Sequence, residues 1–212
     1  MKIALFGATG MIGGRILREA LNRGHQVTAI VRDPAKLTEQ HAHLTVITGD
    51  ILNSDSIAET VKGANAVVSA YGPSGAADRT IVDAAQSLIT GLSKAGVKRL
   101  LTVGGAGSLE VAPGLQVIDT PDFPVAYKSN AGAQRDALGV YKSEANALDW
   151  TYLSPAGMIA PGERTNTFRL GGDQLVVDAE GNSRISAEDY AVAVIDELES
   201  PKHVQQRFTL GY

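Results

Sequence analysis

The stretch that decides the fold is MKIALFGATGMIGG, residues 1–14. Residues 3–6 form an uninterrupted apolar run, Ile-Ala-Leu-Phe, which is typical of a strand buried on both faces of a parallel sheet. A turn of the form G-x-x-G-x-x-G follows, and residues 11–21 then place apolar side chains at helical spacing. A strand, a glycine turn and a helix in this order predict the phosphate-binding turn of a dinucleotide fold.

Each glycine of this turn has its own expected role. Gly7 allows a tight turn after the strand, Gly10 leaves room for a pyrophosphate to approach the backbone, and Gly13 lets the helix pack close to the strand. The N–H groups at the start of the helix then face the phosphates. A glycine turn without a ligand is the alternative, and the flanking strand and helix argue against it. The predicted cofactor contacts of this segment are Gly7, Thr9, Gly10, Met11, Ile12 and Gly13.

Composition narrows the class of protein. A length of 212 residues with 44% hydrophobic residues fits a single domain spanning residues 1–212. The net charge of −4 argues against nucleic-acid binding, and no apolar run or N-terminal leader predicts a membrane segment or export. We therefore expect a cytoplasmic protein. With no cysteine and no metal-ligand spacing among its four histidines, the chain predicts no disulfide, no thiol nucleophile and no metal site.

The end of the second predicted strand, residues 26–31, bears on cofactor choice. An acidic residue there would bind the ribose 2′-hydroxyl of NAD, whereas an arginine offers a planar fork for the 2′-phosphate of NADP. Arg32 occupies this position and favours NADP(H). Its neighbour Asp33 leaves NAD(H) as the alternative, and a solvated loop charge is the other interpretation of Arg32.

Strands and helices alternate through the first hundred residues. Further strands are predicted at residues 44–48, 66–70 and 98–103. Helices are predicted from residue 11 to an end near Arg23-Gly24, at 55–61 with Ser54 as its cap, and at 78–95. This alternation predicts an α/β fold with a Rossmann-like, doubly wound parallel sheet.

Several positions fall at the carboxyl ends of these strands, where open α/β sheets bind ligands. Asp50 follows the third strand and is expected either to bind an adenine amino group or to act only as a turn residue. The turn at residues 71–75 is expected to pass under the cofactor, and residues 104–109 to lie beside its nicotinamide half. The predicted contacts here are Ala70, Tyr71, Gly72 and Gly104.

The second half of the chain predicts a small, loop-rich region that carries the substrate pocket, built mainly from residues 104–130 and 154–185. Residues 110–126 contain three prolines and predict an irregular loop. A helix at 125–148, strands at 149–153, 175–177 and 207–210, and a helix at 187–198 capped by Ser186 complete the chain. Arg164 is expected either to hold an anionic substrate or to form a surface ion pair.

Several motifs together resemble a known family. They are GATGMIGG at 7–14, VRDP at 31–34, VGGAGSL at 103–109, DWTYLSPA at 149–156, PGERT at 161–165 and RLGGDQL at 169–175. The chain resembles the atypical short-chain dehydrogenase/reductase-like proteins of the NAD(P)H-binding group, in particular its bacterial NADH-flavin reductase subgroup. This resemblance implies a Rossmann fold, bound NADP(H), and a flavin or another small acceptor as substrate.

The chain lacks the Tyr-x-x-x-Lys pair with which many short-chain dehydrogenases protonate a carbonyl, because Ala131 and Ala145 stand four residues after Tyr127 and Tyr141. Hydride transfer to a flavin or quinone-like acceptor needs mainly orientation and exclusion of water. An NADPH-dependent oxidoreductase of this kind is therefore expected, and a non-catalytic NADP(H)-sensing protein is the alternative.

Two side chains are catalytic candidates. Ser108 is expected to position the acceptor or the nicotinamide amide, or else only to bond local backbone. Tyr127 is a candidate for proton supply, but packing on the core is the expected role of a single tyrosine near the start of a helix.

Overall fold

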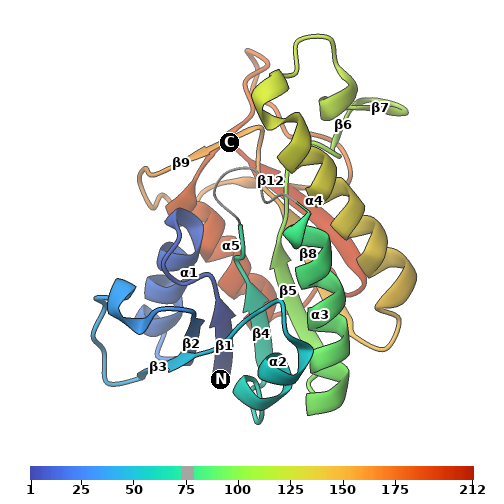
Figure 1. Cartoon of the computed structure of the whole chain (residues 1–212). Helices are drawn as coiled ribbons and strands as arrows, with labels where there is room; N and C mark the ends of the chain where they lie inside the picture. The colour runs from blue at the N-terminus through green and yellow to red at the C-terminus, as the bar shows by residue number, and fades with distance from the viewer. Residues whose placement is uncertain (73–78) are drawn as a thin grey trace.

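One eight-stranded sheet organises the fold in a computed structural model that describes residues 1–72 and 79–212 (Figure 1). In spatial order its strands are β10 (Arg169–Gly171), β12 (Gln206–Gly211), β8 (Asp149–Ser154), β5 (Arg99–Val103), β4 (Ala66–Ser69), β1 (Lys2–Phe6), β2 (Gln26–Val31) and β3 (Leu44–Thr48). Neighbouring strands are parallel except β10, which runs antiparallel to β12. The predicted doubly wound α/β class is confirmed.

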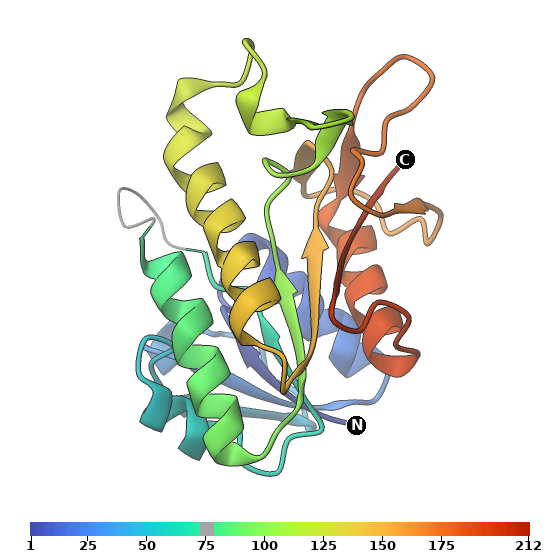
Figure 2. The same ribbon diagram turned by 90° about the vertical axis from the view of Figure 1, so that its right-hand side faces the viewer.

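Helices cover both faces of the sheet. On one face lie α1 (Met11–Asn22) and α5 (Ala187–Glu199), which contact each other; on the other lie α2 (Ser54–Thr60), α3 (Thr80–Ala95) and α4 (Val125–Glu144). Figure 2 shows α3 and α4 on one side of the sheet and α5 on the other. Because strands alternate their side chains between the faces, the buried residues form two apolar clusters, with Leu5 in one and Phe6 in the other.

The ends of the helices follow local capping chemistry. The Oγ of Ser186 accepts from the Asp189 N–H and caps α5 as predicted. The predicted cap at Ser54 is wrong: the side chain of Asn53 accepts from two N–H groups and caps α2 one residue earlier. Both residue types cap helices well, so sequence alone did not separate them. Helix α4 ends at Glu144, one turn before the predicted end.

Two small two-stranded sheets are added to the fold. Strands β6 (Glu110–Ala112) and β7 (Leu115–Gln116) form a hairpin, which the 3-10 turn η2 (Val117–Asp119) follows, where an irregular loop was predicted. Strands β9 (Met158–Ala160) and β11 (Arg184–Ser186) pair in parallel. Both small sheets lie toward the carboxyl ends of the main strands, at the upper end of Figure 1.

The strand predicted at residues 175–177 is wrong. The chain instead pairs as β10, with Leu170 opposite Leu210 of β12, and the Leu175 N–H donates to the Glu110 carbonyl at 2.9 Å. Residues 169–171 lie at the edge of the main sheet, whereas Leu175 bonds Glu110 of the β6–β7 hairpin. Only the tertiary structure shows which of these two segments pairs with the main sheet.

Some predictions fall on residues that the structure does not describe. Pro73, Ser74 and Gly75 of the turn predicted under the cofactor, and the predicted first helical residue Asp78, lie outside the described residues. Helix α3 is described from Thr80. Within residues 1–72 and 79–212, none of the helices combines the length and apolar character that crossing a membrane requires.

Candidate functional site

A cleft of about 450 Å³ opens at the carboxyl edge of the sheet, above β1, β2 and β4. The chain order of the strands reverses there, since β2 and β3 extend the sheet to one side of β1 and β4 to the other. This is where doubly wound sheets bind ligands. The predicted cofactor contacts that line the cleft are Gly7, Thr9, Gly10, Arg32, Asp50, Ala70, Tyr71 and Gly72. Those outside its lining are Met11, Ile12, Gly13 and Gly104.

The glycine turn adopts the geometry that its spacing predicts. Gly7 has a φ of +82°, and a Cβ there would lie 2.3 Å from the Ala70 carbonyl oxygen. A Cβ on Gly13 would lie 2.0 Å from the Gly7 carbonyl oxygen, so this position brings α1 against the turn. Gly10 is more open, and its N–H donates to the Gly7 carbonyl at 3.0 Å. The start of α1 therefore adjoins the cleft, with its first-turn N–H groups suited to an anion.

Two cations also line the cleft. Arg32 and Lys36 are both there, and Asp33 lies between them in the sequence. The Asp33 carboxylate accepts from the Ala35 N–H at 3.2 Å and lies 3.9 Å from the Lys36 ammonium. Asp33 thus pairs with Lys36, and Arg32 has no such ion pair among the described residues. Lys36 was not singled out from the sequence, although Pro34 places it on a turn directly after Arg32.

Asp50 acts as a turn residue, which was one of its two predicted roles. Its Oδ1 accepts from the Leu52 N–H at 3.0 Å, and its own N–H donates to Ser56 Oγ at 3.0 Å. It also lines the cleft, so adenine binding stays a prediction.

The glycines after β5 make room for neighbouring side chains of the protein. A Cβ on Gly104 would lie 2.0 Å from the Tyr152 ring. On Gly105 it would lie 3.0 Å from Gln134 Cβ, and on Gly107 2.7 Å from Ala131 Cβ. These positions let α4 and the β8 side chains approach the end of β5. The cofactor contact predicted for Gly104 stays a prediction.

Ser108 is buried and bonded to a distant arginine. Arg207 of β12 donates from one nitrogen to the Ser108 carbonyl and Oγ, both at 3.1 Å, and its Nε donates to Asp173 at 2.6 Å. The Arg207 side chain is 5% exposed. The contact ties the turn after β5 to the loop after β10, and its 99-residue separation left no signal in the local sequence. Acceptor positioning by Ser108 stays a prediction.

Known proteins match this chain over almost its whole length. The model of the NAD(P)H-binding family matches residues 7–201. The chain belongs to this family. It is 43% identical to the Bacillus subtilis protein YwnB over 99% of this chain and 98% of that protein. The predicted family is confirmed.

Solved structures of family-like proteins have the same fold. A candidate exported protein from Burkholderia pseudomallei is 51% identical, with a TM-score of 0.92 and 100% of both chains covered. A candidate NADH-flavin reductase from Streptococcus pneumoniae is 35% identical, with a TM-score of 0.88, covering 100% of this chain and 99% of that one. These likenesses support the Rossmann-like architecture throughout the chain.

The buried tyrosines of this family member do not replace the absent Tyr-x-x-x-Lys pair. Burial raises the pKa of Tyr141 to about 12, and burial also raises the pKa of Tyr152 and of Tyr190. A tyrosine activated for proton transfer needs the opposite shift. These hydroxyls therefore act as neutral hydrogen-bonding groups.

The structure also places Tyr127 and Arg164, the two remaining candidates from the second half of the chain. Tyr127 is 65% exposed, so the expected packing on the core is wrong: the first turns of α4 extend beyond the sheet. Arg164 donates two hydrogen bonds to the carboxylate of Glu19 on α1, at 2.8 and 2.9 Å. The ion-pair interpretation of Arg164 is confirmed.

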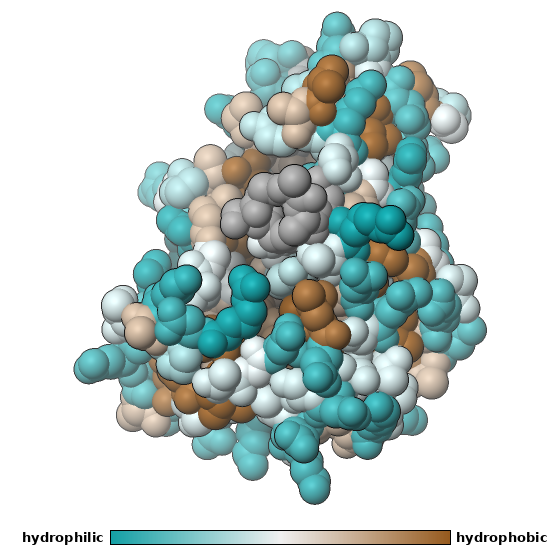
Figure 3. Space-filling view, in the orientation of Figure 1, coloured by the Kyte–Doolittle hydropathy of each residue, from teal (hydrophilic) through white to brown (hydrophobic). Residues whose placement is uncertain are grey.

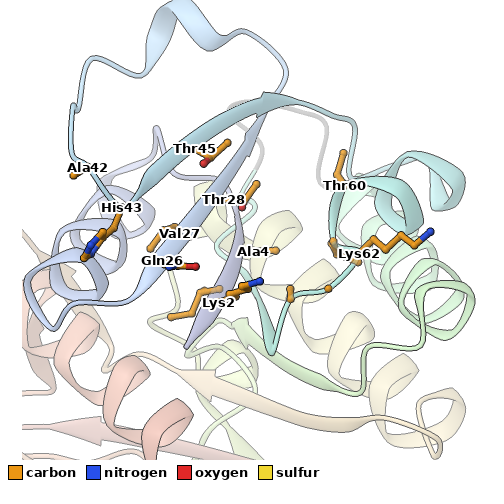
Figure 4. A pocket seen from close by; sticks show the side chains of 14 residues that line it. Lys2, Ala4, Gln26, Val27, Thr28, Ala42, His43, Thr45, Thr60 and Lys62 are labelled. Carbon is orange, nitrogen blue, oxygen red and sulfur yellow. The ribbon is translucent and has the colours of Figure 1, made fainter.

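A second hollow of about 360 Å³ lies at the opposite, amino end of the sheet (Figure 4). Its lining includes Lys2, His43 and Lys62, but Figure 4 shows that these side chains extend in different directions. No converging charged cluster forms among the residues drawn there, and the carboxyl edge remains the candidate site.

Proposed function

We propose that this protein is an NADPH-dependent oxidoreductase that transfers hydride to a flavin or a quinone-like small acceptor. The observation that carries the proposal is the cleft at the carboxyl edge. Its lining includes the glycine turn that leads into α1, with Gly7 and Gly10, and the cations Arg32 and Lys36. A dinucleotide would place its pyrophosphate at the helix start and a 2′-phosphate beside the two cations.

Bound NADPH would supply the hydride at nicotinamide C4. The chain's own groups bind and orient: the first-turn N–H groups of α1 hold phosphate charge, and Tyr71 with Gly72 continues the cleft wall past β4. The Tyr71 hydroxyl bonds Thr80 Oγ1 at 2.9 Å, which fixes that wall to the start of α3. Acceptors that need no strong protein acid suit a chain without the Tyr-x-x-x-Lys pair.

Exposed apolar side chains in the second half of the chain suit an apolar acceptor. Val111, Leu115, Val125 and Tyr127 are exposed on the hairpin and the first turns of α4. Figure 3 shows apolar groups among polar ones at the upper end of this face, and further apolar groups toward its middle and lower left. Exposed apolar surface of this kind commonly marks a binding site. The likeness to the Streptococcus pneumoniae candidate NADH-flavin reductase supports the same class of acceptor.

The test combines binding with turnover. The purified protein is titrated with NADPH and NADH by nucleotide fluorescence, and oxidation of each is followed by absorbance with FMN, FAD, riboflavin or menadione against a protein-free control. We expect tighter binding of NADPH and faster oxidation with at least one acceptor. Tight NADPH binding without acceleration by any acceptor would contradict the enzyme and favour a non-catalytic NADP(H)-sensing protein.

A further inference from the structure

We propose that the core between the sheet and α4 contains a built site for a single buried water molecule, held by the Thr102 hydroxyl of β5. The site lies on the face of the sheet that α3 and α4 cover, and Figure 2 shows these two helices beside each other over that face. Among the described residues that line it, only Tyr71 also lines the cofactor cleft. The site is therefore distinct from the cleft, and the inference does not depend on the proposed function.

Three hydroxyl-bearing side chains stand in register across the sheet. Ser69 of β4 pairs with Thr102 of β5, and Thr102 pairs with Tyr152 of β8. Val67 and Leu100 lie two residues earlier on their strands and belong to the apolar cluster under α3 and α4, so the row faces these helices. Ser69 is 3% exposed and Thr102 is 9% exposed, so both hydroxyls need partners away from bulk solvent.

Thr102 finds no such partner within the protein. Its Oγ1 is one of three buried side-chain atoms of the described residues that have no hydrogen-bond partner. The Tyr141 hydroxyl of α4 lies nearby: burial raises the pKa of Tyr141 to about 12, and the Thr102 hydroxyl partly offsets that rise. The two hydroxyls thus approach each other without completing a hydrogen bond. An unpaired buried hydroxyl destabilises the fold, and a bridging water removes that cost.

A cavity of about 10 Å³ adjoins Thr102. This volume is about what one enclosed water molecule needs. Its polar lining comes from three elements, with Ser69 on β4, Thr102 on β5, and Gln134 and Tyr141 on α4. Buried waters make two to four hydrogen bonds, and this lining offers enough groups for them.

The lining also specifies the kind of guest. None of the described residues around the cavity carries a charge, so neither a cation nor an anion suits it. The hydroxyls of Ser69 and Thr102 can each donate or accept, and the Gln134 amide has both donors and an acceptor. The site can therefore satisfy a water molecule whichever way the amide is turned. A small neutral molecule that both donates and accepts is required, and water fits that description.

The first test is a high-resolution crystal structure of the full chain. We expect one ordered water in the cavity, within hydrogen-bond distance of Thr102 Oγ1 and of at least one of Ser69, Gln134 and Tyr141. A cavity without a solvent peak, or with a peak that does not contact Thr102, would overturn the proposal. This outcome is decided by the wild type alone, even if a variant of Thr102 does not fold.

The second test counts bound water in solution. Magnetic relaxation dispersion of the water oxygen reports molecules that stay in a protein longer than its tumbling time. Thr102→Val keeps nearly the same side-chain shape and removes the hydroxyl, so the dispersion amplitude should fall by that of one water molecule. Thr48→Val makes the same change at an exposed position of β3 and should leave the amplitude as it is in the wild type. Equal amplitudes for the wild type and a folded Thr102→Val would show that Thr102 holds no water.

Discussion

Replacing Gly13 by alanine should disturb both the close packing of α1 on the glycine turn and the position of the first-turn N–H groups of α1 at the cleft. A Cβ at this position would lie 2.0 Å from the Gly7 carbonyl oxygen and 2.7 Å from its carbon. Gly7 cannot move away easily, because its backbone packs closely on Ala70: a Cβ built on Gly7 would lie 2.3 Å from the Ala70 carbonyl oxygen. Helix and turn must therefore move apart, which also displaces the first-turn N–H groups from the cleft.

The magnitude follows from two opposing effects. Overpacking a close contact costs about 1 to 3 kcal/mol of unfolding free energy, and backbone contacts this close fall at the upper end. Alanine in place of glycine inside a helix returns about 1 kcal/mol. Gly14→Ala is the matched control, because it has the same helix and the same propensity gain but meets only the Ala8 carbonyl oxygen at 3.4 Å. The difference between the two variants isolates the steric cost, about 1 to 3 kcal/mol.

Urea unfolding and NADPH titration measure both consequences. Gly14→Ala should be as stable as the wild type or more so, and should bind NADPH normally. Gly13→Ala should unfold at lower urea and melt lower by about 2 to 4 °C for each kcal/mol lost. It should also bind NADPH more weakly. If both variants had equal stability and equal NADPH affinity, close packing of α1 on the turn would not be what Gly13 provides.

Three further predictions concern single side chains. Arg32→Ala should raise the Kd for NADPH by about 10- to 100-fold, the size of one charge-assisted pair, and leave NADH within about twofold; equal losses for both nucleotides would exclude 2′-phosphate recognition. The Arg164 guanidinium holds the pKa of Glu19 below its usual value, so Glu19 stabilises the fold above that value and the contribution is lost as the pH falls below about 4.5. Unfolding free energy should depend less on pH there in Glu19→Gln, and an unchanged slope would count against the ion pair. Asp189 is fully buried and accepts the Tyr212 hydroxyl at 2.8 Å and the Asn166 N–H at 2.7 Å. Asp189→Ala should lose about 1 to 3 kcal/mol for the donors left unpaired, measured by urea unfolding, and wild-type stability would disprove it.

The central strands and the glycine turn were predictable because their signals are local. Residues 3–6 are a continuous apolar run and residues 26–31 are mostly apolar, as a sheet covered on both faces requires. Prediction failed where two neighbouring positions had similar sequence signals. Asn53 caps α2 in place of Ser54, and the strand forms at residues 169–171 (β10) instead of residues 175–177. In both cases the three-dimensional position of the segment, at the helix end or at the edge of the sheet, decides between the two candidates.

The candidate site divides in the same way. The cleft lining near Gly7 and Arg32 was predictable, since both follow a strand and the carboxyl ends of parallel strands meet at one edge. The surroundings of the turn after β5 were not. Its glycines face α4 and β8, and Ser108 bonds Arg207 across 99 residues of chain.

By itself, then, the sequence determined the order of strands and helices, the phosphate-binding turn and the family, because periodicity and glycine spacing act within a few residues. Only the tertiary structure decided that Gly104 leaves room for the Tyr152 ring, that Arg207 bonds Ser108, and that Gln134 of α4 contacts Tyr152 of β8. The physical reason is that such contacts join segments far apart in the chain, and close packing of helices on the sheet, rather than any local preference, sets which side chains meet.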